Sequence, residues 1–192
     1  MGCLPSAICN NDGVDLNTCC GNFHNLKEFG KLLINTLGTI PSDQSYSIVG
    51  FATNTSFVSN LEMISDAFSS MDTLAYAGGV TNHAAAISSC QETLSNPDVD
   101  GRKNMILLIS DGTPTEPKDT AEKDAIAAAK EAKQAGSILI PMMISTDEED
   151  DSIDTMTTDY MSQISSNGLF FNASLLALDN LGESLLSKVV CQ

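Results

Sequence analysis

A short apolar run that ends abruptly in turn-forming residues constrains the fold more than any other stretch of the sequence. Residues Met105 to Ile109 are all apolar, and Ser110, Asp111 and Gly112 follow them at once. Such a run is typical of a strand buried on both faces of a parallel sheet. Ligands of open α/β sheets bind beyond the carboxyl ends of the strands, so the sequence predicts Asp111 at a ligand-binding edge. The alternative is that Asp111 only begins a turn or caps the next helix.

Size and charge limit what this chain can do. Its 192 residues, 42% of them hydrophobic, are enough to bury one core. Nine basic and 25 acidic residues give a net charge of -16, which disfavours binding to nucleic acids and to anionic membranes. No apolar stretch is long enough to cross a bilayer, and residues 1–12 lack the basic and apolar regions of a signal peptide. Taken alone, the missing signal indicates a cytosolic protein.

The cysteines indicate an oxidising compartment instead. Four of the six crowd into residues 1–22, an Asn- and Gly-rich segment with little periodicity, which disulfides commonly order. Zinc is less favoured, because the segment has no Cys-x-x-Cys pair. Cys90 lies on a helical stripe and is expected to be a reduced core residue. The candidate disulfide cysteines are Cys3, Cys9, Cys19, Cys20 and Cys191, and the candidate N-glycosylation sites, which fit a secreted protein, are Asn54 and Asn172.

Hydrophobic periodicity predicts alternating helices and strands. We expect residues 1–22 to be a loop or insertion and residues 23–192 to form the domain. The predicted helices cover 23–37, 61–68, 84–94, 120–135, 160–164 and 176–190, and the predicted strands cover 46–53, 55–58, 105–109, 137–145 and 169–172. Pro141 predicts a bulge or an edge position within its strand, and the acidic run 147–151 is expected to be a solvated loop. The alternation predicts a doubly wound, mostly parallel α/β sheet with helices on both faces.

Five segments follow one another in a characteristic order: YSIVGFAT, AGGVTNHAAAI, MILLISDGTP, ILIPMMIS and GLFFNAS. This order, which covers Phe23 to Cys191, resembles a von Willebrand factor type A domain. The most specific pieces are Gly78 to Asn82 and Ser110 to Gly112. They look like the second and third loops of the metal-ion-dependent adhesion site of that family.

The resemblance implies a binding mechanism. In such a site Thr81 would bind Mg²⁺ or Ca²⁺ through its hydroxyl, and Asp111 would lie close by, usually through a water. Gly79, Asn82 and Gly112 would form the rim. The cation keeps one coordination position open for a carboxylate of a protein partner. The resemblance therefore implies an extracellular or cell-surface adhesion module, and the alternatives are a metal-independent interaction domain and an intracellular assembly scaffold.

The chain departs from the family pattern at the first metal motif. An Asp-x-Ser-x-Ser sequence should precede the Phe23 helix and is missing there, and the same letters at Asp43 to Ser47 precede a strand and would lie at the opposite edge. The opening Met1-Gly2 matches the end of the motif in many family members, so we expect the chain to lack the central first strand. Because Thr81 and Asp111 supply only two oxygen ligands, we expect this chain to bind Mg²⁺ or Ca²⁺ weakly or not at all.

Enzymes with similar motifs are disfavoured. In a haloacid-dehalogenase-like phosphatase, the position of Ile109 would hold the nucleophilic Asp. A serine hydrolase would need a Gly-x-Ser-x-Gly elbow beside His24 or His83, and the latter is expected in a helix first turn near the rim. A dinucleotide-binding enzyme would need a strand before Gly78-Gly79. We therefore expect a binding protein and not an enzyme, with the phosphatase as a remote alternative.

Overall fold

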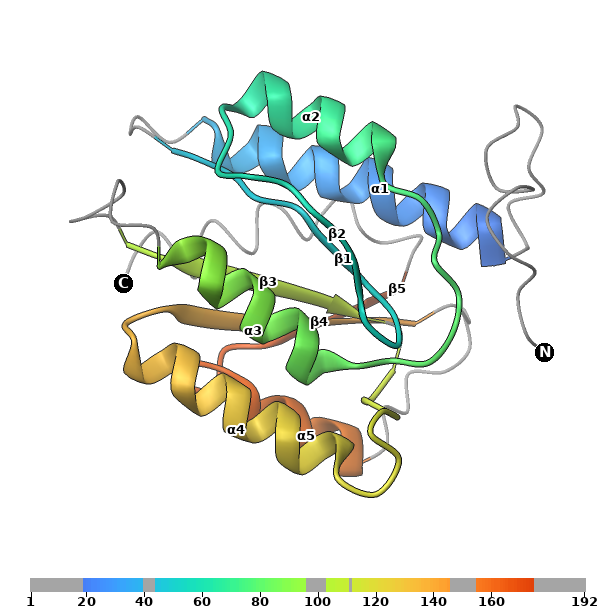
Figure 1. The fold of residues 1–192 in the computed structure, drawn as a ribbon, viewed down its shortest axis with the longest axis vertical. Coiled ribbons are helices and arrows are strands. Elements are labelled where there is room, and N and C mark those ends of the chain that lie inside the picture. Colours follow the sequence, from blue (N-terminus) through green and yellow to red (C-terminus); the bar gives the residue numbers. More distant parts are fainter. Residues whose placement is uncertain (1–18, 40–43, 96–102, 111, 146–154, 175–192) are drawn as a thin grey trace.

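The fold alternates helices and strands, as the periodicity predicts. The computed structural model describes residues 19–39, 44–95, 103–110, 112–145 and 155–174. Its elements are α1 (Cys19–Leu37), β1 (Val49–Phe51), β2 (Thr55–Val58), α2 (Ile64–Thr73), α3 (His83–Leu94), β3 (Met105–Ser110), α4 (Ala121–Gln134), β4 (Ile138–Ser145), α5 (Thr155–Ile164) and β5 (Phe171–Ser174) (Figure 1). This order confirms the predicted α/β class. No helix of the described residues is long and apolar enough to cross a membrane.

The described strands form two separate sheets. β3, β4 and β5 make a parallel sheet with β4 in the centre, in a register that runs from Met105 opposite Ile138 to Ser145 opposite Ser174. β1 and β2, which match two of the predicted strands, form an antiparallel hairpin. No hydrogen-bonded pair of described strands joins the hairpin to the parallel sheet. Helix α3 packs against both β1 and β3, so the two sheets share one covering helix.

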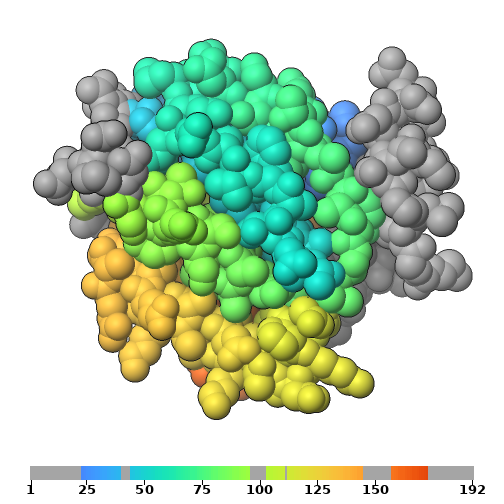
Figure 2. All heavy atoms as spheres, in the orientation of Figure 1, coloured from blue at the N-terminus to red at the C-terminus, as the bar shows by residue number. Residues whose placement is uncertain are grey.

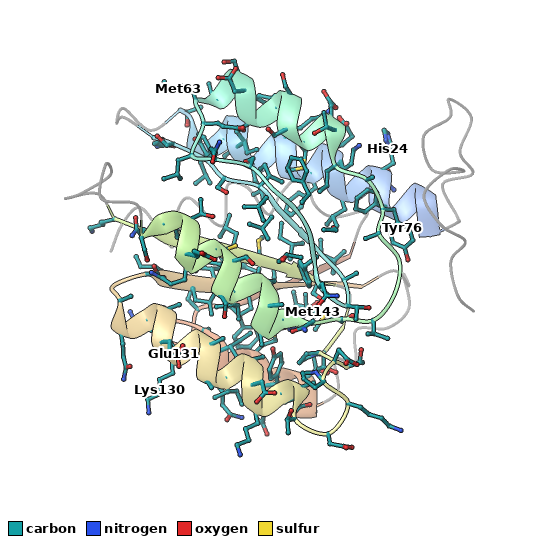
Figure 3. All side chains as sticks on the ribbon, viewed as in Figure 1. His24, Met63, Tyr76, Lys130, Glu131 and Met143 are labelled. Carbon is teal, nitrogen blue, oxygen red and sulfur yellow. The ribbon has the colours of Figure 1, made fainter. Side chains whose placement is uncertain are left out.

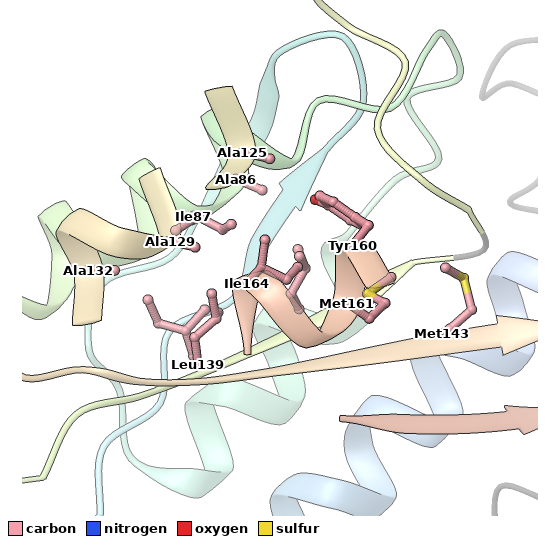
Figure 4. Close-up of a cluster of buried hydrophobic side chains, with 12 residues drawn as sticks. Ala86, Ile87, Ala125, Ala129, Ala132, Leu139, Met143, Tyr160, Met161 and Ile164 are labelled. Carbon is pink, nitrogen blue, oxygen red and sulfur yellow. The ribbon is translucent and has the colours of Figure 1, made fainter. Parts of the chain in front are cut away.

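Helices cover both faces of the parallel sheet because alternate strand residues point in opposite directions. On one face, Ile106, Leu108 and Leu139 belong to a core with residues of α3, α4 and α5 (Figure 4). On the other face, Phe29 and Leu33 of α1 pack on β4 and β5 residues, namely Ile140, Met142, Ile144 and Phe171. A smaller cluster of Ile34, Ala67 and Met71 joins α1 to α2. The strand β4 is therefore buried on both sides, as its apolar sequence predicts.

The alanines of α4 allow this helix to pack closely. The buried positions are Ala121, Ala125, Ala129 and Ala132. Ala128, beside this stripe, is only partly buried. The observed spacing of four, four and three residues keeps the stripe on one side of a helix with 3.6 residues per turn.

Pro141 contradicts the prediction of a bulge or an edge position. It lies in the central strand, fully buried and in regular register with Leu108. The Ile138 N–H points toward the side of β3, because it donates to Asn104, and the Leu139 N–H points to the other side, toward Ser166. By this alternation the missing N–H of Pro141 would face the side of β5, whose pairing begins one residue later at Met142. The proline therefore removes no hydrogen bond between strands.

Several predicted boundaries differ from the structure. Helix α1 begins at Cys19, so the loop predicted for residues 1–22 is wrong for its last four residues. The predicted start at residue 23 rests on the apolar residues that face the core, and the first turn of the helix lies outside that pattern. The strand expected over 46–53 is regular only at 49–51, where a register shift follows Gly50. Helix α2 starts at Ile64, because Glu62 pairs with Tyr46. The predicted last helix and the acidic run lie outside the described residues.

Candidate binding edge formed by three loops

Three loops meet at the carboxyl end of β3. They are residues 52–54 at the tip of the β1–β2 hairpin, residues 78–82 before α3 and residues 112–116 after β3, and we call them together the three-loop edge. Figure 1 shows the hairpin tip beside the chain that leads into α3. In Figure 2 the hairpin tip, the segment before α3 and the segment after β3 share one surface. This is the end of the sheet at which the sequence predicts ligand binding.

Asn82 joins the hairpin to α3 with both its backbone and its side chain. Its backbone N–H donates to the Ala52 carbonyl at 3.0 Å, and its Nδ2 donates to the Thr53 carbonyl at 3.1 Å. Its Oδ1 accepts a hydrogen bond from the Ala85 N–H at 2.9 Å and so caps the N-terminus of α3. The side chain expected at the rim is thus used to hold two of the three loops together.

Gly79 allows the hairpin tip to approach the loop before α3. Its φ is +98°, and a β-carbon added there would lie 2.7 Å from the Thr53 hydroxyl. The same hydroxyl accepts a hydrogen bond from the Val80 N–H at 3.3 Å. Both the left-handed backbone and the close contact require glycine at this position. Gly112, in contrast, has nothing within 4 Å of an added β-carbon.

Thr81 is bound to the segment that follows β3. Its carbonyl accepts hydrogen bonds from the Thr115 N–H at 2.8 Å and the Glu116 N–H at 3.1 Å. Its own N–H donates to the Thr115 hydroxyl at 3.1 Å. The backbone of Thr81 therefore fixes two loops against each other. Asp111 lies outside the described residues, so its proximity to Thr81 stays a prediction.

A buried hydrogen-bond chain lies directly behind the three-loop edge. The His83 Nδ1 is 2.7 Å from the Tyr160 hydroxyl, and its Nε2 is 2.9 Å from the Ser110 hydroxyl. The Ser110 hydroxyl donates to the Gly112 carbonyl at 3.0 Å. Burial lowers the pKa of His83 to about 4 and raises that of Tyr160, so both side chains are neutral near pH 7.

His83 corrects one sequence interpretation. We expected this residue in a helix first turn near the rim, and it is indeed the first residue of α3, but its side chain is fully buried. Its partners are 27 and 77 residues away in the sequence, so no local pattern indicates them. The only sequence feature that points to these hydrogen bonds is a histidine at the start of a helix together with a serine at the end of a strand. The other histidine, His24, points outward from α1 (Figure 3).

The described residues offer few metal ligands. Among them no three His, Cys, Asp or Glu side chains are grouped so as to hold a metal ion. The hydroxyl of Thr81 is a hard oxygen donor of the kind that Mg²⁺ and Ca²⁺ prefer, and the sequence adds the carboxylate of Asp111. This donor chemistry fits a hard cation, but two oxygens leave most of its coordination positions to water or to a partner.

The remaining predicted site residues are placed as follows. Cys90 is a free thiol that packs against the core, and burial raises its pKa to about 11. Asn54 is exposed at the hairpin tip, and Asn172 is exposed in β5, and glycosylation of both asparagines stays a prediction. Cys19 and Cys20 begin α1, without described side chains. Cys3, Cys9 and Cys191 lie outside the described residues, and the disulfide prediction stays open.

A groove lies away from the three-loop edge, toward the other end of α3. Its volume is about 380 Å³, and it is lined by Val58 at the end of β2, by residues 59–61 and by Ser89, Glu92 and Thr93 of α3. Val58 is 49% exposed there. None of the predicted ligand and rim residues lines this groove.

Known structures share this fold. The pilus adhesin SpaC from Lactobacillus rhamnosus GG, in its open conformation, superposes with a TM-score of 0.69 at 14% identity, covering 88% of this chain and 28% of SpaC. The vWF domain of the type V pili tip protein Mfa5 from Porphyromonas gingivalis gives a TM-score of 0.65 at 10% identity, covering 87% and 89% of the two chains. The SpRpn10 VWA domain gives 0.62 at 15% identity, covering 84% and 82%.

The sequence itself also matches a family model. No curated protein matches the chain, and the chain spans only 28% of the length of SpaC. The model of the von Willebrand factor type A domain, however, matches residues 20–183. This match includes all three loops of the three-loop edge and every described helix and strand except the first residue of α1. The chain therefore belongs to the von Willebrand factor type A domain family.

Proposed function

We propose that this chain is a protein-interaction module that binds its partner at the three-loop edge. The observation that carries the proposal is that loops from three distant parts of the sequence are hydrogen-bonded into one surface around Thr81. Rigidly held loops are where such scaffolds place binding residues. SpaC and Mfa5, whose folds are similar, are a pilus adhesin and a pili tip protein. Their likeness supports an extracellular or cell-surface location, and binding without catalysis.

The proposed mechanism uses a divalent cation between the two proteins. Thr81 and Asp111 would hold Mg²⁺ or Ca²⁺ from this chain, and an acidic side chain of the partner would complete the coordination. This chain has a net charge of -16, which repels an acidic side chain of the partner. The positive charge of the cation would offset that repulsion at the site. Because this chain offers only two such ligands, we expect cation binding to be weak alone and stronger with a carboxylate present.

A metal-independent contact is the second candidate, and a specific observation favours it. The three loops are already joined by direct hydrogen bonds, so their arrangement needs no cation. Val80, next to Thr81, is 42% exposed and presents an apolar contact at the same edge. The SpRpn10 VWA domain shares the fold. In this case Val80→Asp would abolish partner binding, while removal of Mg²⁺ would leave it unchanged.

Titration with Mg²⁺ separates the two candidates. Amide signals of the ¹⁵N-labelled chain are followed by NMR as Mg²⁺ is added, first alone and then with acetate as the simplest carboxylate. Metal-dependent binding predicts shifts at Thr81, Gly112 and Thr115, with a lower apparent Kd when acetate is present. Asp111→Asn and Thr81→Val each remove one ligand atom with little change of shape, and both should remove these shifts.

The control is Asp119→Asn, which makes the same charge change at an exposed position after the edge. It should leave the titration unchanged, because surface carboxylates gather cations only diffusely. Shifts that survive Asp111→Asn, or that Asp119→Asn reduces equally, would reject the cation mechanism. The metal-independent candidate would then be the remaining one, tested through Val80.

A further inference from the structure

We infer that His83 is a positioning residue of the three-loop edge: its ring connects α5 to the end of β3 and so holds the segment after β3 against Thr81. The imidazole is in contact with residues of two other elements, Tyr160 of α5 and Ser110 of β3. It begins α3, immediately after the loop that carries Thr81. No other buried polar group of the described residues connects three elements in this way.

The hydrogen-bond chain has one direction. The Ser110 hydroxyl donates its proton to the Gly112 carbonyl, so toward His83 it can only accept. The His83 Nε2 must therefore carry a proton and donate it to Ser110 across 2.9 Å. In the neutral ring Nδ1 then has a lone pair, which accepts the Tyr160 O–H at 2.7 Å. The structure thus assigns the Nε2–H tautomer, in which both ring nitrogens of His83 are hydrogen-bonded.

The hydrogen bonds of His83 complete a closed ring of contacts around the three-loop edge. From His83 the path runs through the Ser110 hydroxyl to Gly112, whose N–H also lies 3.4 Å from that hydroxyl. The segment then continues to Thr115 and Glu116, which bond to the Thr81 backbone. Thr81 returns to His83 through Asn82 in the sequence. In the sequence, Asp111 stands between Ser110 and Gly112, which both belong to this ring.

Burial makes the part of this contact ring around His83 stiff. His83 and Tyr160 are 0% and 1% exposed, and Ser110 is 8% exposed, so water cannot replace a broken bond without entering the core. The rings of His83 and Tyr160 are stacked with centroids 5.8 Å apart, and the Phe51 ring meets His83 edge-on. Figure 4 shows Tyr160 projecting from α5 into the same core as Ala86 and Ala125. The positioning role rests on the proposed function only in that the edge binds the partner.

Two substitutions of His83 test the role because they mimic its two nitrogens separately. His83→Asn places an oxygen near Nδ1 and keeps the Tyr160 bond but removes the donor to Ser110. His83→Gln places an amide N–H near Nε2 and keeps that donor. In His83→Asn we expect the Thr115 and Glu116 amides to exchange about five- to tenfold faster, because one buried hydrogen bond behind them is lost. His83→Gln should restore most of the protection, and the Leu107 and Ile140 amides should change in neither variant.

Two further measurements keep the inference falsifiable if these variants fold poorly. In the unmodified protein, ¹⁵N NMR of the His83 ring should show a protonated Nε2 and an unprotonated Nδ1; the opposite tautomer would overturn the assignment. Ser110→Ala removes the hydroxyl that accepts from His83 and donates to Gly112, and it should accelerate exchange at Thr115 and Glu116 at least as much as His83→Asn. Equal acceleration in the core strands, or no acceleration at the edge, would show that His83 only fills the core. These readouts involve no ligand, so they stand apart from the Mg²⁺ titration.

Discussion

At Gly79 the backbone conformation and the space around it both exclude a side chain. We expect Gly79→Ala to destabilise the protein by about 2–3 kcal/mol, because it combines a left-handed backbone with a forced contact at the Thr53 hydroxyl. Gly136→Ala is the matched control: its φ of +93° is similar, but nothing lies within 4 Å of the added carbon. That variant should lose only about 1 kcal/mol.

The comparison is made by urea unfolding of the two variants and the unmodified protein. The difference between the two free energies of unfolding isolates the contact with Thr53 from the backbone strain. Equal losses would mean that the hairpin tip moves away at little cost, and that Gly79 does not fix its approach to Thr81.

Cys90 illustrates how burial controls thiol chemistry. Its pKa rises from 9.0 to about 11, so at pH 8 the folded protein has about a hundredfold less thiolate at this position than an unburied thiol would have. Because the thiolate is the reactive form, raising the pH toward 11 should accelerate alkylation of Cys90, and lowering the pH should slow it further. Peptide-resolved mass spectrometry after iodoacetamide treatment should find Cys90 unmodified in the folded state at pH 8 and modified in urea. Rapid labelling of the folded protein would contradict its placement against the core.

At the scale of elements, helix α4 is joined to the end of α5 by one lysine. The Lys133 ammonium donates to the Gln163 and Ser165 carbonyls at 3.0 Å each, and so satisfies carbonyls at the C-terminus of α5. Lys133→Met keeps the length of the side chain and removes both bonds. We expect it to lower the free energy of unfolding by about 1–2 kcal/mol, because the group is only half-buried.

The control for Lys133 is in the same helix. Lys130 is exposed and points away from the fold (Figure 3), and Lys130→Met makes the same chemical change. It should change the stability by less than about 0.5 kcal/mol. If thermal denaturation gives the same effect for both variants, the loss reflects the charge of α4 and not the contact with α5.

The elements that the sequence predicts best are those with a strong local pattern. The continuous apolar runs of β3 and β4 and the alanine stripe of α4 fix their boundaries within a residue or two. The strand predicted at 46–53 is longer than β1 at both ends, because its mostly apolar run begins before the pairing at Val49 and continues past the register shift at Gly50 and Phe51. Pro141 was misjudged because its environment depends on where β5 begins, which is set by pairing between distant segments.

The candidate site was predictable only in part, for the same physical reason. Thr81 and the turn after Ser110 are visible as motifs, and the rule for carboxyl ends of parallel strands places them at one edge. The bonds that join them use Thr53, Asn82 and Thr115 in ordinary loop sequences. The His83 chain is defined by partners on two other elements. Such contacts follow from the packing of the whole molecule and leave no periodic signal.

At the scale of the whole molecule, the described strands form two sheets, and helices pack on them to different extents. The parallel sheet is covered by α1 on one face and by α3, α4 and α5 on the other. The β1–β2 hairpin has only two strands, and Ser56 and Val58 of β2 are exposed. An isolated two-stranded hairpin is marginally stable in water. The hairpin therefore depends on α3 and on the bonds of Asn82 for its position.

This division predicts that the hairpin opens before the parallel sheet. In native-state hydrogen exchange the amides that pair β1 with β2 should be at least about tenfold less protected than those of β4 at Ile140 and Ile144, because opening the hairpin breaks no strand pairing of the parallel sheet. Asn82→Ala should widen the difference, since it releases the Thr53 carbonyl and the α3 cap but touches neither β4 nor β5. Equal protection in both sheets, or an equal response of both sheets to Asn82→Ala, would contradict this prediction. Either result would show that the hairpin and the parallel sheet unfold as one cooperative unit.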